Sequence, residues 1–579
     1  MIRILIRKML TAQIFSALTV SLCLLIDSVM ISRFLGEEAI AAYGLANPLL
    51  LSIGAIGTLL AAGVQVVCSK ALGRGSQEEA NTGYASSVAA AAVISVVFAA
   101  VVILFRSFLA QAMGAGRSGA LFEKTRDYLA GFSIGAPGSV GALVLIPFLQ
   151  MAGQSGLLIA AVLAMTVTDV VLDLLNVLVF NGGMFGMGLA SALSYYAAMA
   201  VAGIYLLSGR NIFRFSRKGI KIRMIADLFA SGIPAGVNML ASVAMVYAMN
   251  RLLKTLDGSQ ALAAFTVIMS IGNAANCITT GTGGVSLTLC GIFFHEEDRS
   301  ALQETVRRLC MFGILLGLGM GLLVLVCAPA FIGVFIPEAG RTQEMAILGL
   351  RLFAAGMIPC CINNAIKYDW QATGRPGLAE IISALEGAVF PVLAAFVFSR
   401  FMKTDGAWLA FAAGEVLTLV TIAVLIRAIG GKAPWKDGAF LLLKEGFGAK
   451  PEEMLEADIA SMEDVTDAAK RAEAFCRQHG QDARISSHIA LCIEEMAGNV
   501  IQHGFRDGKP HHLSVLILNK PDRWVLRFRD DCRAFDPVHY RPADMKDALG
   551  IRLVQGLARD AYYTYSMNLN NLALILPKE

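Results

Sequence analysis

The chain has 579 residues, of which 56% are hydrophobic and only 16% are charged, against roughly 25% charged residues in soluble proteins. Its mean hydropathy of +0.64 excludes a soluble globular protein as a description of the whole chain. The formal net charge of +4 is small for this length. Because the Lys and Arg residues flank apolar segments instead of forming a stripe, no nucleic-acid partner is expected.

The apolar residues are unevenly distributed along the chain. Almost all long uncharged runs lie before about residue 430, and the remainder has the composition of a soluble α/β domain. We therefore predict four parts: two six-helix bundles over residues 1–215 and 216–432, a linker over 433–454 and a cytoplasmic domain over 455–579.

The apolar runs have the length of membrane-spanning helices. A bilayer core about 30 Å thick requires about 20 apolar residues per helix. The N-terminal segment reaches this length and lacks a convincing signal-peptide cleavage site, so it is interpreted as the first span. Twelve such stretches begin near Ala12, Leu45, Tyr84, Tyr128, Gly156, Met187, Leu228, Ala261, Leu309, Ala346, Leu378 and Ala407. All are too long for barrel strands, which predicts an all-α polytopic membrane protein.

Basic residues in the loops predict the orientation in the membrane. Arg3, Arg7 and Lys8 precede the first helix, and six more basic residues lie between positions 210 and 223. Because cytoplasmic loops carry the excess of Lys and Arg, both flanks of the first bundle are expected in the cytoplasm. Twelve crossings return the chain to that side. We therefore expect a multi-pass protein of the cytoplasmic membrane whose N-terminus and C-terminal domain are cytoplasmic.

The two halves of the apolar part resemble each other. AIAAYGLANPLLLSIG near residue 40 is similar to ALAAFTVIMSIGNAAN near residue 262, and LAAGVQVV near residue 60 is similar to GTGGVSLT near residue 281. Both matches fall at a shift of about 221 to 222 residues. Because six helices is an even number, such a repeat is parallel and places a cavity between two bundles. The alternative is chance similarity among helices rich in Ala and Gly.

Three sequence motifs of the apolar part identify a family. They are IDSVMISRFLGEEAIAAYGLANPLL, TDVVLDLLNVLVFNGGMFGMGLASALSYY and QATGR, in this order along the predicted helices. Together they resemble the multidrug and toxin extrusion (MATE) family over about residues 12 to 430. The resemblance implies two six-helix bundles forming a V around a central cavity that opens alternately to each side of the membrane.

Three acids lie inside predicted helices of the first half: Asp27, Asp169 and Asp173. The last two are spaced i, i+4, so both carboxylates project from one helix face. A carboxylate in hydrocarbon is costly and normally has a partner or an ion. Two carboxylates on one face repel, so we expect one to hold a proton or both to share a cation. The alternative is that Asp27 and Asp169 lie near a helix end or bond to backbone.

The MATE resemblance implies a cation site at these positions. The family uses an acid in the first helix, an N-x-x-x-D pair in the fifth and a hydroxyl in the sixth, which correspond to Asp27, Asp169, Asp173 and Ser191. This chain has Asp169 where Asn is commoner and Ser191 where Thr is commoner. Oxygen ligands suit a hard cation, and these residues leave Na⁺ and H⁺ both open as the coupling ion. The acids Glu380, Glu386 and Glu415 of the second half are assigned no role.

The residues after Pro434 follow the pattern of a soluble α/β domain. Two helical segments, MEDVTDAAKRAEAFCRQHGQ and ISSHIALCIEEMAGNVIQHGF, precede the strand-like LSVLILN and WVLRFRDD. The second helix carries Glu495, Asn499 and His503 at i, i+4 and i+8. This E-x-x-x-N-x-x-x-H signature resembles the GHKL ATPases, most closely the anti-sigma-factor serine kinases, over about residues 455 to 577. The resemblance implies that Glu495 is the general base and that Asn499 binds Mg²⁺.

Two further motifs extend this second resemblance. DDCRAFDP resembles DDGxxFDP, in which the first acid accepts a hydrogen bond from the adenine amino group, and Asp530 is the match. ALGIRLVQGLARD, which contains Gly550, resembles the glycine-rich turn that opens a helix facing phosphate. Cys532 and Ala548 stand where the family has Gly, and both add a side chain where the ligand approaches. The alternatives are a domain that binds Mg-ATP and a degenerate interaction or sensing module.

These observations favour an exporter of small organic or xenobiotic compounds, coupled to Na⁺ or H⁺ and surrounded by membrane lipids. Its ATPase-like domain would regulate transport or link it, through a protein partner, to a phosphorylation pathway. A lipid-linked oligosaccharide flippase of the same superfamily and a membrane-anchored serine kinase are the alternatives. The transporter itself is not expected to be an enzyme, with ATP binding or serine kinase activity of the domain left open. No G-x-x-x-x-G-K-[ST] loop of an ATP-driven pump is present.

Overall fold

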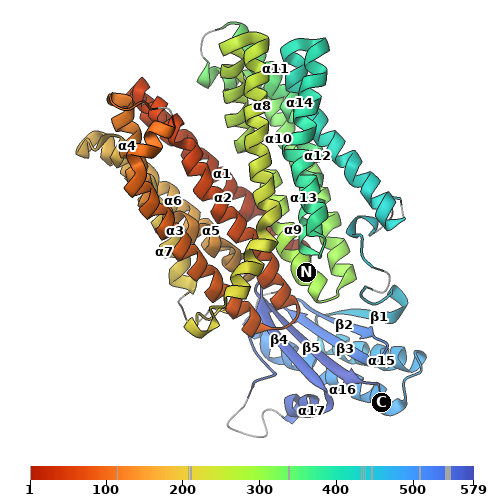
Figure 1. The fold of residues 1–579 in the computed structure, drawn as a ribbon. Helices are drawn as coiled ribbons and strands as arrows, with labels where there is room; N and C mark the ends of the chain where they lie inside the picture. The colour runs from red at the N-terminus through yellow and green to blue at the C-terminus, as the bar shows by residue number, and fades with distance from the viewer. Residues whose placement is uncertain are drawn as a thin grey trace.

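The computed structural model describes residues 2–578 except 114, 207, 209–210, 337–338, 432, 435, 437, 445–446, 508–509 and 541–548. It consists of a long-helix part and a smaller domain in which helices cover a sheet (Figure 1). This confirms the predicted fold class, an all-α membrane part followed by an α/β domain.

The long-helix part contains fourteen α-helices among the described residues. We call α1 to α7 the first bundle and α8 to α14 the second bundle. The helices are α1 (Ile2–Met30), α2 (Glu37–Gly73), α3 (Gln77–Ala112), α4 (Ala120–Ser133), α5 (Ala136–Met151), α6 (Ser155–Leu175), α7 (Gly183–Leu206), α8 (Ile222–Ala275), α9 (Cys277–His295), α10 (Arg299–Phe335), α11 (Arg341–Ala355), α12 (Met357–Ala372), α13 (Pro376–Ala384) and α14 (Phe390–Gly430).

Eight helices of the described residues are long and apolar enough to cross a membrane, or ten if each of two bent helix pairs is one span. The pairs α4–α5 and α11–α12 bend by 46° and 45°. Lys403, with φ of 50°, also divides α14 into two helical segments. Twelve crossings are reached only if α1 is counted and α14 is divided there, so the predicted number stays a prediction.

The bent pairs occupy equivalent places in the two bundles. α4 begins at Ala120 and α11 at Arg341, which is a separation of 221 residues. The second members, α5 and α12, begin at Ala136 and Met357 with the same separation. This separation matches the shift of the sequence repeat, so the repeat extends to the position of a helix bend and is not limited to shared composition.

The two bundles meet through a close crossing of α2 and α8. A side chain at Gly63 would collide with the carbonyl oxygen of Leu228, and one at Gly232 would collide with that of Leu59. Only residues without a Cβ allow backbones to approach so closely, as at small-residue crossings in membranes. The crossing lies toward the sheet, and the bundles diverge toward their opposite ends (Figure 1). We call the end near the sheet the sheet end.

The smaller domain contains one five-stranded antiparallel sheet with the order β1-β2-β3-β5-β4. Its elements are β1 (Met454–Ile459), α15 (Met462–Gln478), α16 (Ala483–Asn499), β2 (Leu513–Asn519), β3 (Arg523–Asp530), α17 (Leu549–Leu557), β4 (Asp560–Ser566) and β5 (Leu569–Pro577). Helices α15, α16 and α17 lie on the face away from the bundles (Figure 1). A capping box of Ser461 and Asp464 begins α15.

Alternation along β3 gives the sheet two different faces. Trp524, Leu526 and Phe528 are buried in the core beneath α15 and α16. Arg527 and Arg529 alternate with them and therefore project to the other face, which is turned toward the bundles. The sheet is thus held by its apolar face within its own domain, while a basic face is presented to the membrane part.

The segment between the bundles and the sheet packs against the second bundle. Leu441 and Leu442 are buried in a core that includes Trp370 of α12. The indole Nε1 of Trp370 donates to the carbonyl oxygen of Phe440 at 2.8 Å. This segment falls within the linker that we predict for residues 433–454, and the three boundaries between the four predicted parts stay predictions.

We predict that Gly63→Val weakens the crossing of α2 and α8. The added side chain collides with backbone that has no rotamer to change, so the free energy of unfolding should fall by about 1 to 3 kcal/mol, the usual cost of overpacking. Denaturant titration of the purified protein in mixed micelles measures this change. Gly54→Val is the matched control, because Gly54 lies in the same helix with nothing within 4 Å of its Cβ position. Equal destabilisation by both substitutions would contradict the close crossing.

Candidate functional site

The three acids predicted for the first bundle come from two helices and are all buried. Asp27 lies in α1, and Asp169 and Asp173 lie one turn apart in α6. Their exposed fractions are 5%, 4% and 0%. The side chain of Asp27 approaches both acids of α6. The structure therefore brings together the three carboxylates that the sequence singled out.

A neighbouring polar contact holds α1 and α6 in this register. One turn before the acids, Cys23 Sγ of α1 lies 3.4 Å from Thr166 Oγ1 of α6. Around the acids the described residues leave carboxylate oxygens without a hydrogen-bond partner, at Oδ1 of Asp27, Oδ1 of Asp169 and both oxygens of Asp173. Buried anionic oxygens without donors need a proton or a cation. The cluster therefore has the composition of a site for a hard cation.

Ser191, the predicted hydroxyl of α7, bonds within its own helix, whereas the nearby hydroxyl of Ser194 lies beside the acid cluster. Ser191 Oγ donates to the carbonyl oxygen of Met187 in its own helix at 3.4 Å. Ser194, one turn further along α7, lies beside Asp169. Tyr195 lies within electrostatic range of the same cluster. The sequence analysis missed Ser194, although its i, i+3 spacing from Ser191 places both hydroxyls on one face of the helix.

The second bundle contains a buried ion pair that the sequence analysis also missed. Lys367 of α12 pairs with Glu386, which lies in the short π-helical turn Leu385–Val389, and both side chains are almost fully buried. Asn364 Nδ2 donates to the same carboxylate at 3.3 Å, and Asn363 Nδ2 donates to Glu415 Oε2 at 2.9 Å. The sequence did offer a signal for this pair, namely a Lys inside an apolar span. Such a charge requires a buried partner of opposite sign.

The GHKL signature of the smaller domain is divided by a change of helix type. Glu495 and Asn499 belong to α16, but residues Val500–Gly504 form a π-helical turn. A π turn inserts an extra residue per turn and rotates the residues after it about the helix axis. His503 is accordingly exposed. A Cβ at Gly550 of α17 would collide with the Glu495 carboxylate, so these two predicted residues do lie together.

Asp530 ends β3 in a buried hydrogen-bond network. Its Oδ1 accepts from Asn570 Nδ2 at 2.7 Å and from the backbone N–H of Cys532 at 3.0 Å. Burial raises the pKa of the Asp530 carboxyl, and these two hydrogen bonds oppose the rise. Asn570 Oδ1 in turn accepts from Tyr563 Oη at 2.6 Å. No motif pointed to Asn570, because it lies 40 residues from Asp530 and only the β3–β5 pairing joins them.

Of the two positions where this chain lacks a glycine of the GHKL motifs, only Cys532 lies in the described part of the structure. Cys532 is buried, and its Sγ lies 2.7 Å from where a Cβ of Gly504 would stand, so the thiol fills the space beside the π-helical turn. Ala548 lies outside the described residues.

The basic face of the sheet docks on the second bundle. Arg529 Nη2 lies 2.5 Å from Glu296 Oε2 and 3.7 Å from Asp298 Oδ2 in the turn between α9 and α10. Lys520 Nζ lies 2.6 Å from Glu297 Oε2. Burial raises the pKa of the Glu296 carboxyl, whereas the hydrogen bond from Lys520 lowers the pKa of Glu297.

The same domain also contacts the first bundle. At the turn between β4 and β5, the backbone N–H of Met567 donates to the carbonyl oxygen of Met151 at 2.6 Å. Asn568 Nδ2 donates to the carbonyl oxygen of Gly153 at 3.0 Å. One rigid sheet is therefore bonded to the sheet ends of both bundles.

Comparison with known proteins gives a family for each part. Residues 12–175 and 234–425 match the MatE family, and residues 459–576 match the histidine kinase-like ATPase domain. A probable multidrug resistance protein of Bacillus subtilis, YoeA, is 23% identical over 420 residues, which are 69% of this chain and 88% of that protein. The multidrug export protein MepA of Staphylococcus aureus is 22% identical over 403 residues, which are 67% of this chain and 86% of that protein.

Solved structures show the same fold for the membrane part. A crystal structure of MATE in complex with MaL6 has a TM-score of 0.68 at 18% identity, covering 72% of this chain and 94% of the other. A MOP superfamily transporter from Pyrococcus furiosus has a TM-score of 0.67 at 18% identity, covering 72% and 93%. The fold and the family of the sequence analysis are confirmed, while the roles of individual site residues stay predictions.

We predict that Asp530→Asn lowers the affinity for Mg-ATP at least about tenfold, or about 1.4 kcal/mol. Since Oδ1 already accepts two hydrogen bonds, the substitution replaces the remaining oxygen by an NH₂ group. In the adenine contact that the GHKL resemblance implies, a donor would then face the adenine amino group. Calorimetric titration of the full chain measures the affinity. Asp467→Asn, an exposed position of α15, is the control. Unchanged affinity in Asp530→Asn would remove this carboxylate from nucleotide recognition.

Proposed function

Because the chain belongs to the MatE family, we propose that it exports small organic compounds in exchange for Na⁺ or H⁺, and that its ATPase-like domain regulates this transport. The observation that supports coupling best is the cluster of Asp27, Asp169 and Asp173, in which four of the six carboxylate oxygens are buried without a hydrogen-bond partner among the described residues. Binding or release of a cation at such a site would shift the equilibrium between the two conformations that alternating access requires.

The acid cluster suggests how an ion and a conformation are linked. With the cation bound, three buried carboxylates are partly neutralised and α1 packs closely on α6. Without it, their repulsion favours separation of the helices or entry of water. α1 also packs against α9 of the second bundle. A change in the occupancy of the acid cluster therefore acts on a helix that contacts both bundles.

The substrate class rests on the relatives. YoeA and MepA are named for multidrug resistance and multidrug export, and we propose the same class, small organic or xenobiotic compounds, for this chain. The oligosaccharide flippase would need free basic groups inside the membrane part to hold a pyrophosphate. Lys367 is a buried basic residue there, but its ammonium group is paired with Glu386. This pairing favours the exporter.

We place the sheet end of the bundles in the cytoplasm, as the basic loops predict. The domain then regulates transport by holding that end closed. Opening toward the cytoplasm requires the sheet ends of the two bundles to separate, and the sheet is bonded to both of them through Glu296 and Gly153. Docking therefore stabilises the arrangement in which the bundles diverge at the other end. A Mg-ATP-dependent change in the domain would alter this restraint without driving transport.

We predict that Asp173→Asn abolishes coupling. In proteoliposomes with an imposed Na⁺ or pH gradient, gradient-driven export should fall at least about tenfold, because a neutral amide binds neither ion in place of the carboxylate. The two gradients, applied separately, identify the ion. Asp127→Asn is the matched control, since Asp127 lies in the first bundle but is partly exposed and paired with Arg126. Unchanged coupled flux in Asp173→Asn would remove the acid cluster from the mechanism.

We predict that Arg529→Gln loosens docking and increases the export rate. Removing one partner of a buried pair leaves Glu296 uncompensated, which typically costs about 3 to 5 kcal/mol. Hydrogen exchange of residues 296–298 should increase, and transport should become faster because the closed end is less restrained. Arg484→Gln, an exposed position of α16, is the control. Faster exchange at the turn with unchanged or slower transport would contradict a restraining role.

A further inference from the structure

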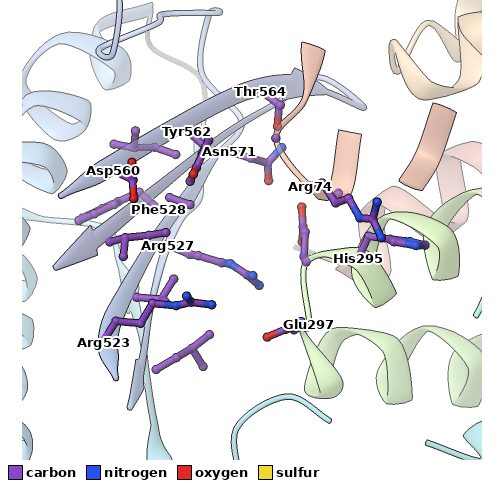
Figure 2. A pocket seen from close by; sticks show the side chains of 18 of the residues that line it. Arg74, His295, Glu297, Arg523, Arg527, Phe528, Asp560, Tyr562, Thr564 and Asn571 are labelled. Atoms are coloured by element: carbon purple, nitrogen blue, oxygen red, sulfur yellow. The ribbon is translucent and has the colours of Figure 1, made fainter. Parts of the chain in front are cut away.

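A cavity of about 440 Å³ lies between the basic face of the sheet and the bundles. Its walls are β2 to β5 on one side and, on the other, the turn after α2 and the turn after α9. Figure 2 shows Arg523 and Arg527 projecting from the sheet, with Arg74 and His295 on the opposite side. Both bundles and the smaller domain therefore contribute to one space that is open to solvent, where Arg74 and Arg559 are exposed, and we call it the interface cavity.

The interface cavity has more basic than acidic side chains. Six Lys and Arg residues line it, against the four acids Glu296, Glu297, Asp522 and Asp560. Three of the basic residues have ion pairs: Arg529 with Glu296, Lys520 with Glu297, and Arg523 with Asp522. Within the described part of the chain, Arg74, Arg527 and Arg559 have no carboxylate within 4.0 Å of their nitrogens.

Of these three residues, Arg527 has the greatest need of a hydrogen-bond acceptor. Its Nη1 is buried and has no hydrogen-bond partner among the described residues. Its cross-strand neighbours are Leu516 on β2 and Ala573 on β5, whose side chains contain no acceptor. Glu296 and Glu297 lie within electrostatic range but are bonded to Arg529 and Lys520. A buried guanidinium nitrogen without an acceptor costs free energy that a bound anion would recover.

We propose that the interface cavity is a binding site for a phosphate-bearing anion, held mainly by the guanidinium groups of Arg527, Arg559 and Arg74. Arginine matches phosphate oxygens through paired N–H donors in a fixed geometry. The volume exceeds that of a single phosphate and lies in the range of small-molecule sites, so a diphosphate group or a phosphate with an organic substituent fits. The phosphate could belong to a soluble metabolite or to a phospholipid headgroup.

This site is distinct from the predicted nucleotide site. Asp530, Glu495 and Gly550 lie on the side of the sheet covered by α16 and α17, whereas Arg527 and Arg529 project to the opposite face. An anion in the interface cavity would contact the sheet and the turns of both bundles at once. It would therefore strengthen docking of the smaller domain, and its binding does not depend on which compound the bundles transport.

The test is calorimetric titration of the full chain with inorganic pyrophosphate, in uncharged detergent, without Mg²⁺ and at constant ionic strength. We expect saturable binding that falls at least about tenfold in the double variant Arg527→Gln/Arg559→Gln. Arg527→Lys, which retains the charge and the fold but loses the paired donors, should lose an intermediate amount. Arg484→Gln, the same charge change at an exposed position outside the cavity, should bind as the unaltered chain does.

Two further experiments identify the source of the phosphate and the site at which pyrophosphate binds. In nanodiscs, adding phosphatidylglycerol to phosphatidylcholine should lower the apparent pyrophosphate affinity if the natural ligand is a lipid headgroup, and leave it unchanged if the ligand is soluble. Loss of the pyrophosphate signal in Gly550→Ala, which changes the predicted phosphate turn and no residue of the interface cavity, would assign it to the nucleotide site and overturn the proposal. Equal binding by Arg527→Gln/Arg559→Gln and Arg484→Gln, or no saturable binding by the unaltered chain, would also overturn it.

Discussion

The close crossing of α2 and α8 is the contact on which the rest of the arrangement depends. Gly63 and Gly232 each face a backbone carbonyl of the other helix, so no side chain separates the bundles at this point. Because packed helices have few alternative positions, the crossing fixes where the turns after α2 and α9 lie. Those turns are where the sheet docks and where the interface cavity forms. The same contact must open if the bundles are to separate at the sheet end.

The acid cluster includes no residue of this crossing, so the ion binding that we propose takes place apart from the contact that holds the sheet ends of the bundles together. Asp27, Asp169 and Asp173 belong to helices of the first bundle alone. A ligand shifts a conformational equilibrium only by the difference in its affinity for the two states. Ion binding can therefore influence the crossing only through a helix that contacts both bundles. α1 meets this condition, because it carries Asp27 and packs against both α6 and α9.

The sequence predicted the parts of the molecule that depend on local pattern. The apolar spans, the Asp169–Asp173 face and the Glu495–Asn499 spacing all follow from periodicity within one helix. It did not predict features made by distant partners. The ion pair of Lys367 joins α12 to a π-helical turn, and Asn570 reaches Asp530 only through strand pairing. The spacing of His503 from Glu495 also does not reveal the π-helical turn at Val500–Gly504, which rotates His503 about the helix axis, and the role of His503 stays a prediction. The sequence shows the arginines of RWVLRFRD, but it does not show that the bundles cover the face from which Arg527 and Arg529 project.

Strand β3 is the structural element that relates the two predicted ligand sites of the smaller domain. Asp530 at its end belongs to the nucleotide side, while Arg527 and Arg529 project toward the interface cavity and the turn after α9. A shift of β3 that accommodates adenine would move the guanidinium groups that hold the second bundle. Coupling between two sites is reciprocal, so an anion in the interface cavity would change nucleotide affinity by the same factor. The regulation that we propose would require no hydrolysis, because binding alone would change the restraint on the bundles. The departures at Cys532 and Ala548 are then compatible with a domain that has kept ligand-dependent docking and no longer needs efficient phosphoryl transfer.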